Sequence, residues 1–363
     1  MKQKHRYIVI YGFLAMLVAG AIGLCLNPKE TISKSERRKL AVMPELTVKN
    51  IVEEDYTEDL ESYLLDHFPL RDSFRRIKAF FSYHILQQKA NNDIYVVGDY
   101  VGKLEYPLSE NSVIKATEKM KSMQETYFPN ATVYYSIIPD KNYFLAAQNG
   151  YPSMDYEKLE QLMQDNLTTM SYIDIFDTLS IEDFYQTDTH WRQEKLQETV
   201  TKMAEQMSVA QYLSWEYEKK TLDEFYGVYY GQSALALPAE TITYLTSDVI
   251  EQASVWNLEQ NETKPIYAED TQSLDKYDLY LHGAQALQVI TSPLAKSDKR
   301  LVVFRDSFGS SLIPLLLEAY QEVVLVDTRY LSSTLLGDYV DFTDADVLFL
   351  YNTLLLNNSA MLK

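Results

Sequence analysis

Hydrophobic and polar positions follow two different periods along this chain of 363 residues. Apolar residues at helical spacing predict helices at Phe74–Ile85, Val113–Tyr127, Leu159–Met170, Leu196–Met207 and Ser311–Tyr320. Short apolar runs between them, several rich in β-branched and aromatic residues, predict strands at Ile94–Val97, Thr132–Ile138, Tyr172–Phe176, Leu301–Phe304, Val323–Val326 and Val347–Tyr351. This alternation predicts an α/β fold, with a parallel sheet flanked by helices on both faces.

The pattern also divides the chain into segments. Residues 1–26 are apolar after a basic start, residues 27–59 are polar and read as a stalk, and residues 60–363 form the α/β domain. Within that domain, residues from about 211 to 295 break the alternation and are rich in Tyr, Gln, Glu and Thr. We expect this stretch to be an insertion or an extension of the sheet.

The N-terminal segment Tyr7–Leu26 carries no charge and has the length that spans a bilayer as a helix. Basic residues precede it, so the positive-inside rule puts the N-terminus in the cytoplasm and the rest of the chain outside. A cleaved signal peptide, cut near Ala19–Ala21, is the alternative. A lipoprotein at Cys25 is disfavoured, because Leu24 stands where a small residue should precede the modified cysteine.

Composition excludes several classes of function. The formal net charge is −19, so the chain repels polyanions and nucleic acid is not an expected partner. Cys25 is the single cysteine, which excludes an intrachain disulfide and a cluster of thiols that could hold a metal. An extracytoplasmic domain without disulfides fits a bacterial cell surface.

Ser307 stands where the strand Leu301–Phe304 ends and a helix is about to begin. In open α/β sheets, ligands bind beyond the carboxyl ends of the strands. A serine hydroxyl at such a turn is exposed, and backbone amides at the start of the helix can hold an oxyanion. The alternative is that Asp306 and Ser307 only cap the helix, since both residue types are favoured caps.

The four letters around Ser307 occur a second time, at Arg71–Phe74. No apolar strand precedes Ser73, and Phe74 begins a helical stripe, so Ser73 is expected to start a helix or to face solvent. The setting between strand and helix therefore distinguishes Ser307, because the tetrapeptide alone does not.

His190 is the best candidate for a general base among the five histidines, because Asp188 precedes it by two residues. Residues two apart in an extended segment point to the same side. Asp188 can then orient the imidazole while the second ring nitrogen faces a serine, as in a catalytic triad. The alternative is again a cap, by Thr187 or Asp188, for a helix that begins near Trp191.

A catalytic role explains the turn at Ser307 and the turn at Asp188 and His190 together. Helix capping would need a separate explanation for each. We therefore predict that Ser307, His190 and Asp188 act together. Asp188 and His190 could supply two metal ligands, but no third histidine follows at a useful spacing, so neither a metal nor another cofactor is predicted.

Six short motifs together resemble the DHHW family of bacterial cell-surface proteins. This family is a branch of the SGNH-hydrolase-like group that includes the alginate O-acetyltransferases. The motifs occur in the family's order, at Asp66–Asp72, Ile138–Lys141, Thr187–Trp191, Arg305–Gly309, Val326–Tyr330 and Leu350–Asn352. The resemblance implies an SGNH-hydrolase-like sheet, with Ser307 as nucleophile, His190 as base and Asp188 as the acid that orients it.

The resemblance also implies further residues near the site, namely Arg329 with Tyr351 or Asn352. Gly283 stands where the family's Gly-Asn pair is expected, and is the candidate for a second oxyanion donor. Two departures are visible: Thr189 replaces the first histidine of the family's name, and Arg305 replaces the glycine of Gly-Asp-Ser forms.

The expected function is an extracytoplasmic O-acyltransferase, O-acetyl by analogy, that modifies a cell-surface polysaccharide or exopolysaccharide. By family analogy, a membrane-bound O-acyltransferase supplies the acyl group. An esterase or O-deacetylase with the same triad is one alternative, and a non-catalytic glycan-binding scaffold is another. The tyrosines of residues 211–295 can stack on sugars under any of these, or fill a core.

Overall fold

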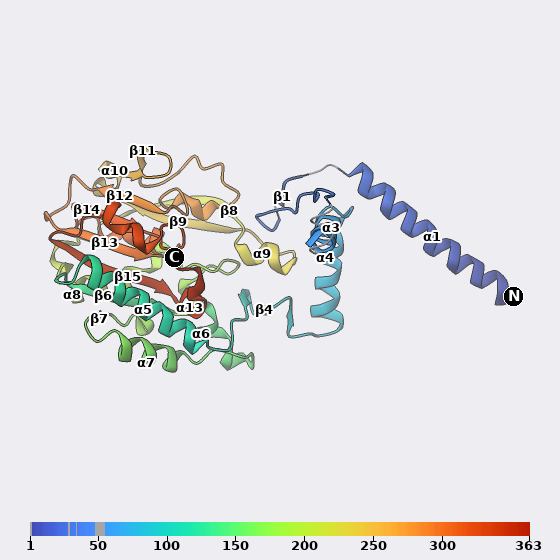
Figure 1. The fold of residues 1–363 in the computed structure, drawn as a ribbon, viewed down its shortest axis with the longest axis horizontal. Helices are drawn as coiled ribbons and strands as arrows, with labels where there is room; N and C mark the ends of the chain where they lie inside the picture. The colour runs from blue at the N-terminus through green and yellow to red at the C-terminus, as the bar shows by residue number, and fades with distance from the viewer. Residues whose placement is uncertain (1, 28–29, 34, 48–54) are drawn as a thin grey trace. The chain divides into compact units, whose positions relative to one another are not determined.

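The computed structural model describes residues 2–27, 30–33, 35–47 and 55–363 (Figure 1). The chain divides into two compact units, and each is described by itself. The smaller unit comprises residues 1–92 and 230–237, and the larger one comprises residues 93–229 and 238–363. The predicted stalk, 27–59, includes residues 28, 29, 34 and 48–54, which lie outside the described residues.

The smaller unit is mainly helical. Its elements are α1 (Lys2–Leu26), β1 (Ile32–Ser33), β2 (Arg38–Lys39), α3 (Asp55–Asp66), α4 (Arg71–Phe80), the π-helical turn η1 (Phe81–Ile85) and β3 (Ala90–Asn91). The strands β1 and β2 pair antiparallel. Ser73 lies in the first turn of α4 and is exposed.

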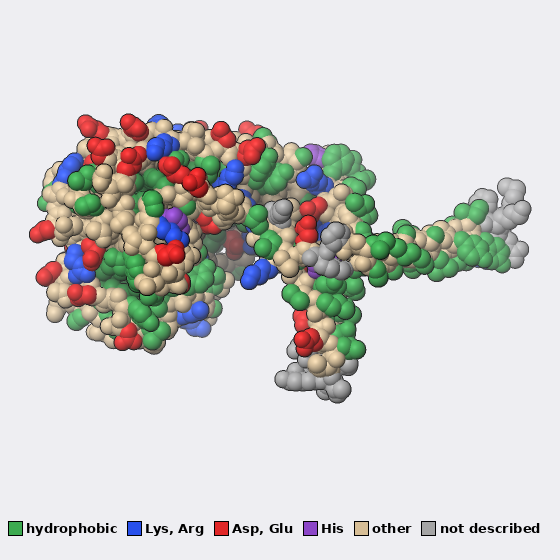
Figure 2. Space-filling view, turned by 90° about the horizontal axis from the view of Figure 1, so that it is seen from above, with side chains coloured by type: hydrophobic (Ala, Val, Ile, Leu, Met, Phe, Trp, Pro, Cys, Tyr) green, Lys and Arg blue, Asp and Glu red, His purple; other side chains and the backbone are tan. Residues whose placement is uncertain are grey.

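The helix α1 is long and apolar enough to cross a membrane. Its segment Arg6–Leu26 has 21 residues, a mean hydropathy of 2.4 and no buried residue. Figure 2 shows hydrophobic side chains along its surface. This helix is compatible with a single-pass anchor and with a signal peptide.

The larger unit is built on a mixed sheet, which has eight strands among the described residues. Along the sheet the strands are β11 (Glu262–Pro265), β10 (Ser254–Asn257), β12 (Leu287–Thr291), β14 (Glu322–Val326), β13 (Arg300–Arg305), β15 (Ala345–Asn352), β6 (Val133–Ile138) and β7 (Ser171–Tyr172). The strands from β14 to β7 run parallel, whereas β10, β11 and β12 add antiparallel pairs. The predicted α/β architecture is confirmed.

Outside this sheet lie the hairpin of β4 (Ile94–Val97) with β5 (Tyr100–Lys103) and the pair of β8 (Glu218–Phe225) with β9 (Glu240–Thr246). The α-helices are α5 (Glu110–Tyr127), α6 (Lys141–Leu145), α7 (Tyr156–Asn166), α8 (Gln197–Gln206), α10 (Asp248–Gln252), α11 (Gly309–Leu312), α12 (Leu336–Tyr339) and α13 (Thr353–Asn357). The helix α9 (Val228–Ser233) begins in the larger unit and ends in the smaller one.

Both faces of the sheet are buried, as continuous apolar strands require. In β13, Leu301 and Val303 belong to one core, which includes residues of α8 and α11. Val302 and Phe304 belong to the other core, which includes residues of α5, α7 and α13. Figure 1 shows α5 and α7 together beside β6 and β7.

Two predicted elements are shorter than expected. The predicted strand Tyr172–Phe176 pairs only at Ser171–Tyr172, and its last residue begins a 3-10 turn. The predicted helix Ser311–Tyr320 is α only up to Leu312 and continues as the 3-10 turn η8 (Ile313–Leu316). Pro314 explains the second difference, because proline has no N–H for a helical hydrogen bond and clashes with the preceding turn.

Candidate active site

Four of the motif segments lie at the carboxyl ends of adjacent parallel strands. Ser307 follows β13, Arg329 follows β14, Asn352 closes β15 and Lys141 follows β6. These strands are neighbours in the sheet, so their carboxyl ends share one edge. That edge is where open α/β sheets bind ligands.

Ser307, His190 and Asp188 form one hydrogen-bonded chain at this edge. The Oγ atom of Ser307 lies 2.7 Å from Nε2 of His190, across 117 residues of sequence. Nδ1 of His190 lies 2.6 Å from Oδ1 of Asp188. Because an ionised carboxylate can only accept, Nδ1 carries the proton, and Nε2 of the neutral ring accepts from the Ser307 hydroxyl.

Asp188 is buried and fully hydrogen-bonded. Its Oδ1 also accepts from the His190 amide at 3.0 Å, and its Oδ2 accepts from the Val228 amide at 2.8 Å. Burial by itself raises the pKa of Asp188, but the electrostatic interaction with His190 and these hydrogen bonds outweigh it, and the pKa lies below its ordinary value. Asp188 does not cap a helix, because the next helical turn, η5 (Gln193–Lys195), has Arg192 at its N-cap.

The imidazole of His190 is held between aromatic rings. The ring of Tyr277 stacks on it, with centroids 3.8 Å apart and planes 8° apart, and the Phe308 ring lies 4.8 Å away. The Tyr277 hydroxyl donates to Oγ of Ser311 at 2.8 Å. Burial raises the pKa of Tyr277 well above its ordinary value, which keeps this hydroxyl protonated. Sequence reasoning did not identify Tyr277, which lies in the segment that breaks the strand–helix pattern.

The Lys141 ammonium holds the loop that carries Asp188. Its Nζ donates to the backbone carbonyls of Val101 (2.6 Å), Tyr185 (2.9 Å), Gln186 (2.8 Å) and Asp188 (3.1 Å). Burial lowers the pKa of Lys141 to about 7. The motif Ile138–Lys141 was noted in the sequence, but its lysine had no assigned role, because the acceptors are backbone atoms that no residue pattern reveals.

The turn at Ser307 leaves a backbone donor free. Asp306 accepts from the Phe308 amide at 3.0 Å and from the Asn352 amide at 2.7 Å. The Ser307 amide has no hydrogen-bond partner among the described residues. The N-cap of α11 is Phe308, which makes no side-chain cap. Asp306 holds the Phe308 amide from the turn before the helix, whereas the Ser307 hydroxyl bonds to His190.

Arg305, which replaces a glycine of the related motif, lies buried beneath this turn. Its guanidinium donates to Oγ of Ser310 at 3.0 Å and to Oε1 of Gln288 at 2.9 Å. The arginine therefore ties the turn to β12, which lies beyond β14 in the sheet.

A cavity of about 250 Å³ opens at Ser307. Its polar lining includes Glu105, Thr189, Asp306, Arg329, Asn352 and Asn358, and its apolar lining includes Phe308, Leu354, Leu355 and Met361. Arg329 donates from Nε and Nη2 to Asp327, and its Nη1 has no partner among the described residues. Burial raises the pKa of Glu105, another residue that sequence reasoning missed.

Arg329 and Asn352 thus lie where the sequence predicted, but two other candidates do not line this cavity. The Gly283 amide donates to the Tyr280 carbonyl at 3.2 Å, so it is not free to hold an oxyanion. The Tyr351 hydroxyl is buried against Oγ1 of Thr328, 3.2 Å away. We therefore leave Gly283 and Tyr351 out of the site.

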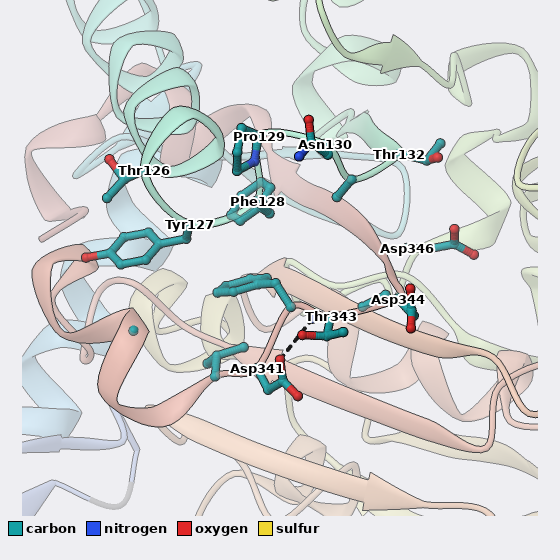
Figure 3. Close-up of a pocket in the computed structure, with 15 residues that line it drawn as sticks. Thr126, Tyr127, Phe128, Pro129, Asn130, Thr132, Asp341, Thr343, Asp344 and Asp346 are labelled. Atoms are coloured by element: carbon teal, nitrogen blue, oxygen red, sulfur yellow. Dashed lines mark hydrogen bonds between the residues drawn. The ribbon is translucent and has the colours of Figure 1, made fainter.

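A larger cavity, of about 700 Å³, lies at the other edge of the sheet (Figure 3). It is lined by Thr126–Thr132, which lead into β6, and by Val340–Asp346, which lead into β15. These segments mark the amino ends of the strands, opposite Ser307. The side chains that line this cavity do not form a metal site. No group of three or more aspartate, glutamate, histidine or cysteine side chains among the described residues could hold a metal ion.

No protein-family model matches the chain, and no curated protein sequence is similar to it. Solved structures are similar in fold. A DHHW family protein from Eubacterium siraeum superposes with a TM-score of 0.62 at 17% identity, over 75% of this chain and 94% of that one. Bacillus cereus PatB1 gives 0.56 at 17% identity, over 73% and 97%, and its structure with a sulfonyl adduct gives 0.54 at 16%, over 72% and 97%. The fold that the six motifs predicted is confirmed.

Proposed function

We propose that this chain is an extracytoplasmic serine O-acyltransferase. It transfers an acyl group, acetyl in the first instance, to a hydroxyl of a cell-surface polysaccharide or exopolysaccharide. The observation that carries the proposal is the hydrogen-bonded chain from Asp188 through His190 to Ser307. Three residues in this order and tautomer are the arrangement that activates a serine for acyl transfer.

In the first half-reaction, Oγ of Ser307 attacks the carbonyl carbon of the acyl donor while Nε2 of His190 takes the hydroxyl proton. The negative charge of Asp188 stabilises the imidazolium that forms. The tetrahedral intermediate then collapses, the leaving group takes the proton from Nε2, and the acyl group remains as an ester on Ser307.

In the second half-reaction, a sugar hydroxyl attacks the acyl-serine and gives its proton to His190. Collapse of this second intermediate releases the sugar ester, and the proton returns to Oγ of Ser307. Both intermediates carry an oxyanion, and the amide of Ser307, which no described residue pairs with, is its first donor.

The cavity at Ser307 is suited to a sugar. Glu105, Asn358 and Arg329 offer acceptors and donors to hydroxyl groups, and the apolar side chains beside them can pack against a pyranose ring. We assign Nη1 of Arg329, which has no partner among the described residues, to an oxygen of the acceptor sugar.

The proposal also includes a location at the membrane and a partner protein. The helix α1 anchors the chain as a single-pass membrane protein, with the catalytic domain outside the cytoplasm. By analogy with the family that the motifs resemble, a membrane-bound O-acyltransferase supplies the acyl group.

Labelling with a sulfonyl fluoride tests the activated serine, and the sulfonyl adduct of PatB1, a protein of similar fold, makes this reagent a natural probe. We expect one sulfonyl group per chain, located at Ser307 by peptide mass spectrometry and absent from Ser307→Ala. The matched control is Ser73→Ala, because Ser73 stands in the same tetrapeptide. If both variants label as the unmodified protein does, Ser307 is not the nucleophile.

Adding an acceptor sugar distinguishes a transferase from an esterase. With an activated acetyl ester and an oligosaccharide mixture, a transferase forms sugar acetate at the expense of free acetate. Free acetate alone, at a rate that no oligosaccharide changes, identifies an esterase.

A further inference from the structure

In the smaller unit, the polar side of α4 and of the turn η1 points inward, toward the rest of that unit. Arg71 and Arg75 bond to the carboxylate of Glu36, at 2.6 and 3.2 Å. Ala79 and Ser82, on the same side, are buried. Charged and small residues thus take the place that large apolar ones occupy in a helix packed on a core.

The apolar side of the same element faces outward. Its five large side chains are 52% to 57% exposed: Phe74, Ile77, Phe80, Phe81 and Ile85. We call these five residues the α4 apolar face. An exposed contiguous apolar surface of this kind marks a site that meets another protein or a membrane.

The loop before α4 packs against the end of α1. A Cβ added to Gly23 would lie 2.7 Å from Cγ of Pro69, and one added to Gly20 would lie 3.9 Å from the Phe68 ring. The Asn27 side chain donates to the His67 carbonyl at 3.0 Å. The small glycines of α1 therefore allow a direct contact with this loop.

Phe68 connects that contact to the α4 apolar face. Its ring lies 5.8 Å from the ring of Phe74. At ~1.5 Å per residue, Gly20 is only about 9 Å along the helix from Leu26, where α1 ends. The α4 apolar face thus begins at the level where a membrane-spanning α1 leaves the hydrocarbon.

Basic residues border the α4 apolar face. At about 100° per residue, Arg76 and Lys78 lie on its two sides, and both are exposed. They stand out in a chain whose net charge is −19. An exposed apolar stripe between basic side chains is typical of a helix that lies in a membrane surface with anionic headgroups.

We propose that α4 and η1 form an interfacial helix, which lies in the outer leaflet of the membrane that α1 crosses. The α4 apolar face enters the acyl region, and Arg76 and Lys78 reach the phosphates of anionic lipids. The inference rests on α1 as a retained anchor and is independent of the chemistry at Ser307. It gives the smaller unit a role in holding the chain at the membrane surface.

Site-directed spin labelling of the full chain tests the proposal. Cys25→Ser removes the single cysteine, and Ile77→Cys, Phe81→Cys or Asp72→Cys then adds one back. Asp72 is the matched control, since it is exposed and lies opposite the α4 apolar face. Each labelled chain is reconstituted into phosphatidylcholine–phosphatidylglycerol vesicles, and the label's accessibility to oxygen and to a water-soluble nickel chelate is measured.

We expect labels at positions 77 and 81 to favour oxygen, which concentrates in the acyl region, several-fold over the nickel chelate. The label at position 72 should favour the chelate. Preference for the chelate at positions 77 and 81 overturns the proposal, because the face is then in water and left for a protein partner. Low access to both reagents, with dipolar broadening between labels, also overturns it, because a second copy then covers the face.

Discussion

The ring of Tyr277 lies flat on the imidazole of His190, with centroids 3.8 Å apart and planes only 8° apart. Tyr277 belongs to the turn η7 (Lys276–Leu279), and its hydroxyl donates to Ser311 in α11. The segment around residue 277, the loop of His190 and the turn after β13 therefore meet at one point. The rotation of the imidazole, and with it the distance to Ser307, depends on this stack.

The first prediction concerns this stack. Tyr277→Phe keeps the ring and loses one hydrogen bond, so we expect acyl transfer to persist and stability to fall by about 1 kcal/mol. Tyr277→Ala removes the surface that orients the imidazole, and a misplacement of this kind lowers kcat by up to ~100-fold. Steady-state rates and thermal unfolding of both variants provide the check. Equal kcat values for Tyr277→Ala and Tyr277→Phe would argue against an orienting role.

The second prediction concerns the carboxylate. Asp188→Asn keeps the shape but lets an amide donate toward Nδ1, which favours the tautomer that cannot accept the Ser307 proton at Nε2. By triad logic, we expect sulfonylation and acyl transfer to slow by ~1,000-fold or more. Asp177→Asn, which changes an exposed carboxylate paired with Lys202, serves as the control and should leave both rates unchanged. A folded Asp188→Asn protein with undiminished rates would remove Asp188 from the mechanism.

The third prediction follows from the buried lysine. Lys141 has a pKa of about 7 in the folded protein and 10.5 as its ordinary value. The unfolded chain therefore binds more protons at this residue between pH 7 and 10.5, and folding is penalised least at the alkaline end of that window. We expect the free energy of unfolding of the wild type, relative to Lys141→Met, to rise as pH increases from 7 to 10.

Urea unfolding of the two proteins at matched pH values measures this difference. All other titrating groups are shared, so they cancel in the comparison. A difference that stays constant would mean that Lys141 keeps its ordinary pKa among the backbone carbonyls, and one that falls would mean that its pKa is raised. Either result would contradict the prediction.

The fourth prediction concerns the cavity. Arg329→Gln removes a charged donor proposed to meet the acceptor sugar, and we expect the KM for that sugar to rise ~10-fold or more, in line with the loss of a charged hydrogen bond. The rate of Ser307 sulfonylation should change little. Arg329→Lys keeps the charge but loses the two-point pairing with Asp327, so its KM should lie between those of the wild type and of Arg329→Gln. A large loss of sulfonylation in Arg329→Gln would place the arginine in the first half-reaction instead.

Much of the fold could be read from the sequence, because the strands of the central sheet are continuous apolar runs. In that sheet, the predicted strand Thr132–Ile138 agrees with β6 and Val323–Val326 agrees with β14, each to within one residue. Outside it, Ile94–Val97 agrees with β4 at both ends. The predicted length of the helix after Ser307 was too great. The apolar spacing continues past Pro314, but proline has no N–H to donate to an α-helical hydrogen bond.

The α4 stripe shows another limit of periodicity. Spacing at Phe74, Ile77, Phe81 and Ile85 gave the helix and the side on which its apolar residues lie. It could not give the direction in which that side faces, because the inward contacts of Arg71 and Arg75 are with Glu36, in a separate segment earlier in the chain.

The candidate site was partly readable. Asp188 and His190 are close in sequence, and Ser307 follows an evident strand, so local patterns were enough to single out these three residues. Tyr277 and Lys141 could not be found in this way. Tyr277 contacts His190 through a ring stack, and Lys141 contacts backbone carbonyls. Gly283 was misjudged, because its amide is already paired within its own turn.

The proposed reaction requires that Ser307 carry the acyl group. Its most direct test is to incubate the purified chain with an activated acetyl ester, quench in acid and map the acetyl group by peptide mass spectrometry. We predict an acetyl ester on Ser307 that accumulates without acceptor, disappears when oligosaccharide is added, persists in Ser73→Ala and is absent from Ser307→Ala. Two results would contradict this: a folded protein that gains no acetyl group on Ser307, or a Ser307→Ala variant that gains as much acetyl in total as the unsubstituted protein.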